Sequence, residues 1–85
     1  MDPADLLKEQ FLQMVDQQLE QNDPPHARST WQRLQREGYT ASTARLLIAQ
    51  CVAAELRRVV ANNETFDEAR YIHNLNRLPE PPEKA

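Results

Sequence analysis

The segment 41–61 limits the possible folds of this chain more than any other stretch. It contains no proline or glycine, and its apolar residues recur at helical spacing along two flanks. The first flank comprises Ala44, Leu47, Ile48, Cys51, Val52 and Val59, and the second comprises Leu46, Ala49, Ala53, Leu56 and Val60. A helix that is apolar nearly all round has to be covered by neighbours. The segment therefore predicts a long central helix, about 41–61, with the other helices around it.

Two amphipathic helices are expected before this segment. Asp2 and Pro3 are typical of a helix start, and the first helix should reach about Gln21. Its apolar stripe comprises Leu7, Phe11, Leu12, Met14, Val15 and Leu19. Asp23 is expected to cap the second helix, with two prolines in its first turn. The buried side of the second helix should contain Ala27, Thr30, Trp31 and Leu34.

Gly38 is the only glycine, and it is expected to end the second helix in the left-handed conformation. Tyr39 should then contact Leu34, and Thr40 should cap the central helix. A fourth helix is expected after Thr65 and Glu68, which have the spacing of a capping box. Its apolar face comprises Ala69, Tyr71, Ile72, Leu75 and Leu78.

These patterns predict an all-α fold, namely a compact four-helix bundle around the long central helix. Residues 1–78 should form a single helical domain, because 85 residues suit one domain. The segment 79–85 is rich in proline and glutamate and has no apolar residue besides proline and alanine to bury. We therefore expect it to be a flexible tail.

Composition favours a soluble cytoplasmic protein. One cysteine excludes an internal disulfide framework, and the acidic N-terminus, which has no long apolar run, is expected to be neither a signal peptide nor a membrane span. The net charge of −3 disfavours nucleic-acid and membrane partners. The charge is uneven, since residues 1–25 are acidic and residues 26–58 carry six arginines against two glutamates. The simplest interpretation is solvated helix faces.

No catalytic, cofactor-binding or metal site is expected, and we do not expect an enzyme. His26 and His73 lie on different predicted helices and lack the paired spacing of a zinc site. Cys51 lies on the first apolar flank, where burial makes a thiol unreactive. The chain has no glycine-rich phosphate loop and no evident pocket for a small-molecule substrate.

Glu55 interrupts the first apolar flank of the central helix. A buried, unpaired carboxylate is costly, so Glu55 should pair with an arginine, accept from Trp31 or Tyr71, or reach an edge. Its alternative role is a specificity contact for a partner chain. Trp31 and Tyr39 are expected to be core anchors at the glycine corner rather than a platform for a ligand.

The stretch "GYTASTAR" resembles the turn and early recognition helix of bacterial repressor-type helix-turn-helix proteins. This resemblance covers about twenty residues, and it implies that the second and third helices bind DNA. The residues that would contact DNA are Arg28, Arg33, Arg36, Ser42, Thr43 and Arg45. Leu34 departs from the pattern, which has a small residue four positions before the turn glycine. The outward Leu46, Ala49 and Ala53 also offer no hydrogen bonds to bases.

Two other resemblances concern the fold more than a site. The glycine, aromatic and alanine after the second helix are similar to the loop of ubiquitin-associated three-helix domains, whose helices are shorter than the segment 41–61. The arrangement of "REGYT", an alanine-rich helix and "TFDEARYIHNLNRLP" resembles short helical bacterial proteins that have no assigned function.

The sequence as a whole favours a small non-enzymatic interaction module. Neighbouring helices can cover one flank of the central helix and part of the other. We expect Leu46, Ala49, Ala53, Leu56 and Val60 to remain partly open and to bind a second copy, as a homodimer, or another helical protein. DNA binding through the second and third helices is the alternative.

Overall fold

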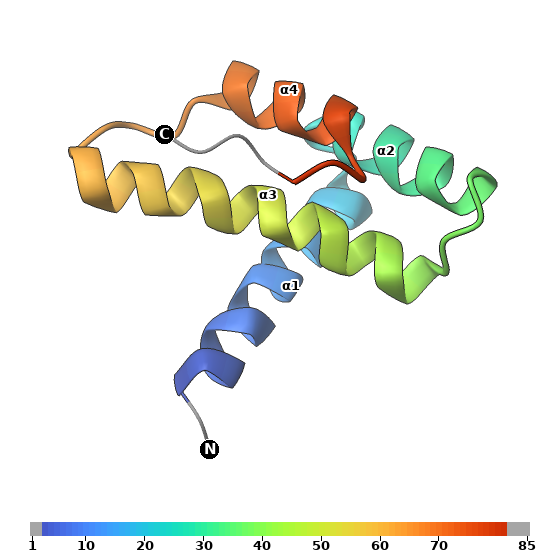
Figure 1. The fold of residues 1–85 in the computed structure, drawn as a ribbon, viewed down its shortest axis with the longest axis horizontal. Helices are drawn as coiled ribbons and strands as arrows, with labels where there is room; N and C mark the ends of the chain where they lie inside the picture. The colour runs from blue at the N-terminus through green and yellow to red at the C-terminus, as the bar shows by residue number, and fades with distance from the viewer. Residues whose placement is uncertain (1–2, 82–85) are drawn as a thin grey trace.

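The computed structural model describes residues 3–81, which form four α-helices and no strand (Figure 1). The helices are α1 (Pro3–Gln21), α2 (Pro25–Arg36), α3 (Ala41–Asn62) and α4 (Glu68–Arg77). The expected all-α bundle is therefore confirmed. The predicted central segment corresponds to α3 almost residue for residue.

Helix α3 contacts each of the other three helices. Helix α4 returns along α3, while α1 crosses it steeply, so that the N-terminal half of α1 projects from the bundle (Figure 1). The first apolar flank of α3 supplies much of the core. Buried core side chains are Val15, Ala27, Leu34, Ala44, Ile48, Ala49, Cys51, Val52, Tyr71, Leu75 and Leu78. Helix α3 is thus packed against all three of the other helices.

The corner between α2 and α3 forms as predicted. Gly38 has a φ of +106°, and the Tyr39 N–H donates to the Leu34 carbonyl oxygen at 3.0 Å. The Thr43 N–H then donates to the Thr40 hydroxyl at 3.0 Å, which caps α3. The corner is therefore fixed by backbone geometry and by one side-chain cap.

The cap predicted for α2 was wrong. Pro24, not Asp23, occupies the N-cap position, and it makes no side-chain capping bond. Pro25 explains the difference, because a residue before proline is pushed toward extended backbone. Pro24 has that conformation, with φ −73° and ψ 150°, and α2 begins one residue later. The cap predicted at Asp2 lies outside the described residues.

The capping box predicted for α4 was also wrong. Asp67 is the N-cap, and its carboxylate accepts from the Arg70 N–H at 3.1 Å. The Asp67 N–H is bonded to the buried Glu55 carboxylate of α3 at 3.2 Å, so a tertiary contact replaces the local box. The buried face of α4 agrees with the predicted one at Leu78 and differs at its N-terminal end. Ala69 is exposed, whereas Tyr71, Asn74 and Leu75 are buried.

The segment after α4 stays close to the helix over its described residues. Leu78 is buried in the core, and Arg77 donates to the Pro81 carbonyl oxygen at 3.2 Å and to the Glu80 carboxylate at 3.1 Å. The predicted domain end at residue 78 stays a prediction, and residues 82–85 lie outside the described part.

The left-handed backbone at Gly38 gives a testable prediction. We expect Gly38→Ala to lower the free energy of unfolding by about 1–2 kcal/mol, because an L-residue is strained at positive φ. An added Cβ would meet no atom within 4 Å, so backbone strain alone is measured. Chemical denaturation followed by circular dichroism is the measurement, with Gln32→Ala on the exposed side of α2 as control. Equal stabilities of the Gly38→Ala variant and the parent would contradict this account.

Candidate interaction surface

The second flank of α3 is covered at two positions and open at the others. Ala49 is buried, and Leu56 packs against the core while staying half-buried. Leu46 is 37% exposed and Val60 is 84% exposed, with Ala53 half-buried between them. The open positions are spaced seven residues apart, so they lie on one line along the helix.

Phe11 of α1 joins this flank to two adjoining hollows. A hollow of about 340 Å³ is lined by Lys8, Phe11, Leu46, Ala49, Gln50 and Ala53. A second hollow, of about 410 Å³, is lined by Phe11, Ala53, Leu56, Arg57, Val60 and Ala61. Both hollows share Phe11 and Ala53, so they form one continuous surface. We call Phe11, Leu46, Ala49, Ala53, Leu56 and Val60 the apolar strip.

The sequence did not predict the contribution of α1 to this surface. Its apolar residues were all expected to face the core, and Val15 does so. Leu7 is nevertheless 52% exposed and Met14 is 39% exposed. They lie four residues before and three residues after Phe11, which places all three on one side of α1. Leu7 belongs to the N-terminal half of α1, which projects beyond the bundle, and this projection explains its exposure (Figure 1).

Polar side chains beside the strip are cationic or neutral. Lys8 borders one hollow and Arg57 borders the other, and both are exposed. Gln50 is the remaining polar residue in the two linings, and none of the carboxylates whose positions the structure describes lines either hollow. The surface therefore combines apolar contact area with a positive border.

Glu55 lies in the core side of α3, away from the apolar strip. Its side chain is buried and is bound by the Arg70 guanidinium, which donates through Nε to Oε1 and through Nη2 to Oε2, the latter at 2.9 Å. With the Asp67 N–H, these donors hold the pKa of the Glu55 carboxyl below its usual range, and the Arg70 hydrogen bond is the main cause. Glu55 is thus a satisfied core carboxylate that fastens the start of α4.

Glu64 extends this cluster to the surface. The Arg70 Nη2 donates to its carboxylate at 3.2 Å, and Arg58 Nε lies 4.0 Å from the same oxygen. Phe66 packs edge-on against Tyr71, with ring centroids 5.5 Å apart. The cluster therefore fixes the connection between α3 and α4, and it contributes no residue to the apolar strip.

The aromatic residues considered as partners of Glu55 bind elsewhere. Trp31 Nε1 donates to the Ala41 carbonyl oxygen at 3.1 Å, which ties α2 to the start of α3. The Tyr71 hydroxyl donates to the Gln18 side-chain oxygen at 2.6 Å, which ties α4 to α1. Trp31 and Tyr39 both pack against the core, so the corner residues anchor the helices.

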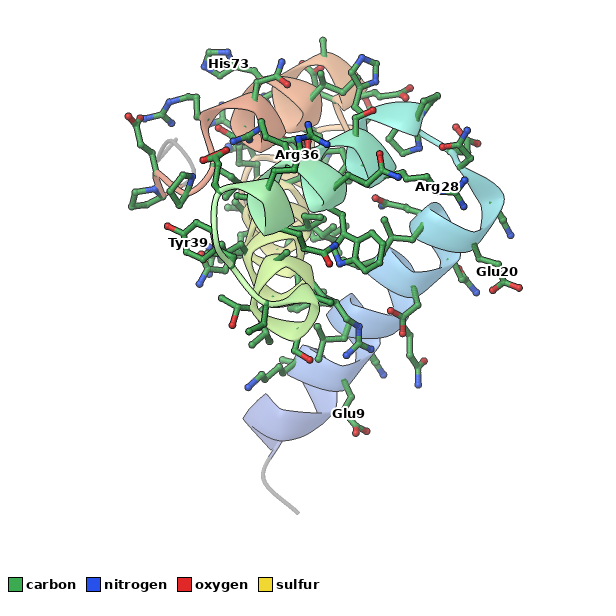
Figure 2. All side chains as sticks on the ribbon, turned by 90° about the vertical axis from the view of Figure 1, so that its right-hand side faces the viewer. Glu9, Glu20, Arg28, Arg36, Tyr39 and His73 are labelled. Carbon is green, nitrogen blue, oxygen red and sulfur yellow. The ribbon has the colours of Figure 1, made fainter. Side chains whose placement is uncertain are left out.

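The residues proposed for DNA contact do not all lie at the corner between α2 and α3, because Arg28 is near the start of α2, beside α1. Arg28 and Arg36 are exposed on α2, with Tyr39 in the connection to α3 (Figure 2). Ser42 and Thr43 are exposed in the first turn of α3.

Three of the arginines in this group are engaged in contacts within the chain, and the first is Arg28, which donates to the Leu19 carbonyl oxygen of α1 at 2.5 Å. Arg45 forms a bidentate pair with Asp16, with both N–O distances 2.6 Å. Arg33 bonds the Glu37 carboxylate and the Leu75 carbonyl oxygen. Reading DNA bases with Arg45 would require the pair with Asp16 to break.

The residues weighed for catalysis or metal binding are separated in space. Cys51 is buried in the core, and burial raises the pKa of its thiol to about 12. His26 and His73 are exposed on α2 and α4. Within residues 3–81, no group of three or more histidine, cysteine or acidic residues could hold a metal ion.

Comparisons with protein families, characterised proteins and solved structures found no match. None of the four described helices is both long and apolar enough to cross a bilayer.

The Glu55–Arg70 contact gives a second prediction. We expect Glu55→Gln to lower the free energy of unfolding at neutral pH by about 2–4 kcal/mol, because it leaves Arg70 and the Asp67 N–H without their anionic partner. The lowered pKa means that this stabilisation is present above the usual glutamate value of about 4.3 and is lost as the pH falls through the folded value.

Denaturation curves of parent and variant across a pH series provide the measurement. The stability difference should narrow as the pH falls below about 4. Glu9→Gln, which removes an exposed carboxylate from α1, is the matched control and should have little effect. A difference between parent and Glu55→Gln that stays constant with pH would refute the assigned role.

Proposed function

We propose that this chain is a small, non-enzymatic interaction module of the cytoplasm that binds an amphipathic helix along the apolar strip. The observation that carries the proposal is the open line of Leu46, Ala53 and Val60 beside two hollows. Scattered apolar residues on a surface are ordinary, whereas a continuous apolar surface marks an interaction site.

A helix suits the dimensions of the strip. The strip spans fifteen residues from Leu46 to Val60, and the fourteen helical rises between them correspond to roughly 21 Å or four helical turns. Apolar residues that repeat every seven positions on a partner helix would contact those of α3 in register. The small side chain of Ala53, at the centre, allows the two backbones to approach closely. Phe11 would contact the partner from the side of α1.

Two sources of the bound helix fit the strip by shape. One is a second copy of this chain, which would form a homodimer, and the other is a different helical protein. In both cases the surface predicted from the sequence, at Leu46, Ala49, Ala53, Leu56 and Val60, would be completed by a partner.

The proposal is tested with a synthetic helical peptide of about four turns that carries leucines on one side and glutamine and alanine elsewhere. Titrated into isotopically labelled protein, it should shift amide signals around Phe11 and along residues 46–60 of α3. A peptide of the same composition, with its leucines spread around the helix, should not.

Substitution of Val60 provides the matching variant. Val60→Asp should weaken peptide binding by at least about tenfold, because a carboxylate replaces an apolar contact, and it should spare stability because the side chain is exposed. Gln32→Asp, on the outer side of α2, should bind like the parent. Peptide binding that leaves the signals of residues 46–60 unchanged, or no binding at all, would exclude the proposal.

A further inference from the structure

We infer that the helix bound by the apolar strip is acidic and comes from another protein, with carboxylates beside its apolar residues. The inference rests on the proposed function and adds the chemistry and source of the partner. It follows from the charged side chains that border the two hollows. It also follows from where those side chains would lie if two copies of the chain formed a two-fold dimer.

Among the side chains that the structure describes, each hollow has one cation at its border and no anion. Lys8 and Arg57 are exposed, and neither forms an ion pair with a residue whose side chain the structure describes. The other arginines on the flanks of α3 differ, since Arg45 is paired with Asp16 and Arg58 lies within 4.0 Å of Glu64. The cations without a local counter-charge thus include those that border the strip.

A second copy packed through α3 does not supply the missing anions. In an antiparallel α3 pair with its two-fold axis at Ala53, residue 57 faces residue 49 of the other copy. Ala49 shares its hollow with Lys8, so Arg57 would approach the Lys8 of the second copy. Like charges at an interface are unfavourable.

A second copy docked through α1 also leaves the cations without partners. The exposed apolar side of α1, at Leu7 and Met14, has Gln10 and Gln17 as its neighbours at helical spacing. Glu9 lies two residues from Leu7, on the opposite side of the helix. An acidic helix from another protein satisfies Lys8 and Arg57 in a way that this chain does not.

Three peptides that differ only in charge test the inference. Each carries the same leucine stripe, and the positions beside that stripe are glutamate, glutamine or lysine. Calorimetry at low salt should show the glutamate peptide binding roughly fivefold to tenfold more tightly than the glutamine peptide, and the lysine peptide binding most weakly. High salt should reduce the differences, because exposed charges are screened.

Paired variants assign the effect to the strip. Lys8→Gln with Arg57→Gln should abolish the preference for glutamate, while Arg36→Glu, on the exposed side of α2, should keep it. Both changes make the net charge more negative by two units, so the general effect of charge is the same in the two variants. Persistence of the preference after the Lys8 and Arg57 substitutions would overturn the inference.

The failures of the inference and of the proposed function are distinguishable. If the three peptides bind with equal affinity and shift the amide signals along the strip, the inference of an acidic partner is overturned. The proposal that the strip binds a helix would still stand. A stable dimer in sedimentation velocity that Val60→Asp dissociates would identify a second copy as the occupant and would also overturn this inference. If none of the three peptides binds and the chain is monomeric, both proposals fail.

Discussion

The burial of α3 is the constraint on which the rest of the structure depends. Its core side carries Ala44, Ile48, Cys51 and Val52, and α1, α2 and α4 each contact it. The three helices nevertheless leave part of the circumference of α3, which has 22 residues, uncovered. The uncovered part is the line of Leu46, Ala53 and Val60, so the candidate interaction surface is a direct consequence of the fold.

A buried carboxylate determines where α4 begins. Glu55 binds both the Arg70 guanidinium and the Asp67 N–H, so it holds the first turn of α4 at a fixed point along α3. Tyr71 then reaches Gln18, which links α4 to α1. One polar group in the apolar flank therefore sets the position of an entire helix, and its satisfied hydrogen bonds offset the cost of its burial.

The sequence predicted what depends on local physics, and it was least informative where tertiary contacts decide. Helical periodicity, Gly38 and the Thr40 cap are local signals, and all three were confirmed. The start of α4 could not be predicted in the same way, because Glu55 supplies the bond that a local capping box would have made. The exposure of Leu7 and Met14 was also missed, since the angle between α1 and α3 is not encoded in the periodicity of either helix.

The two hollows occupy the angle between α1 and α3, with Phe11 as a wall of both. Their shape therefore depends on how firmly α1 is attached, and its attachments include the Asp16–Arg45 pair and the Gln18–Tyr71 bond. In the proposed complex, the affinity for a helix would therefore depend on the contacts that hold α1 in place. Residues that do not contact the bound helix would then contribute to its affinity.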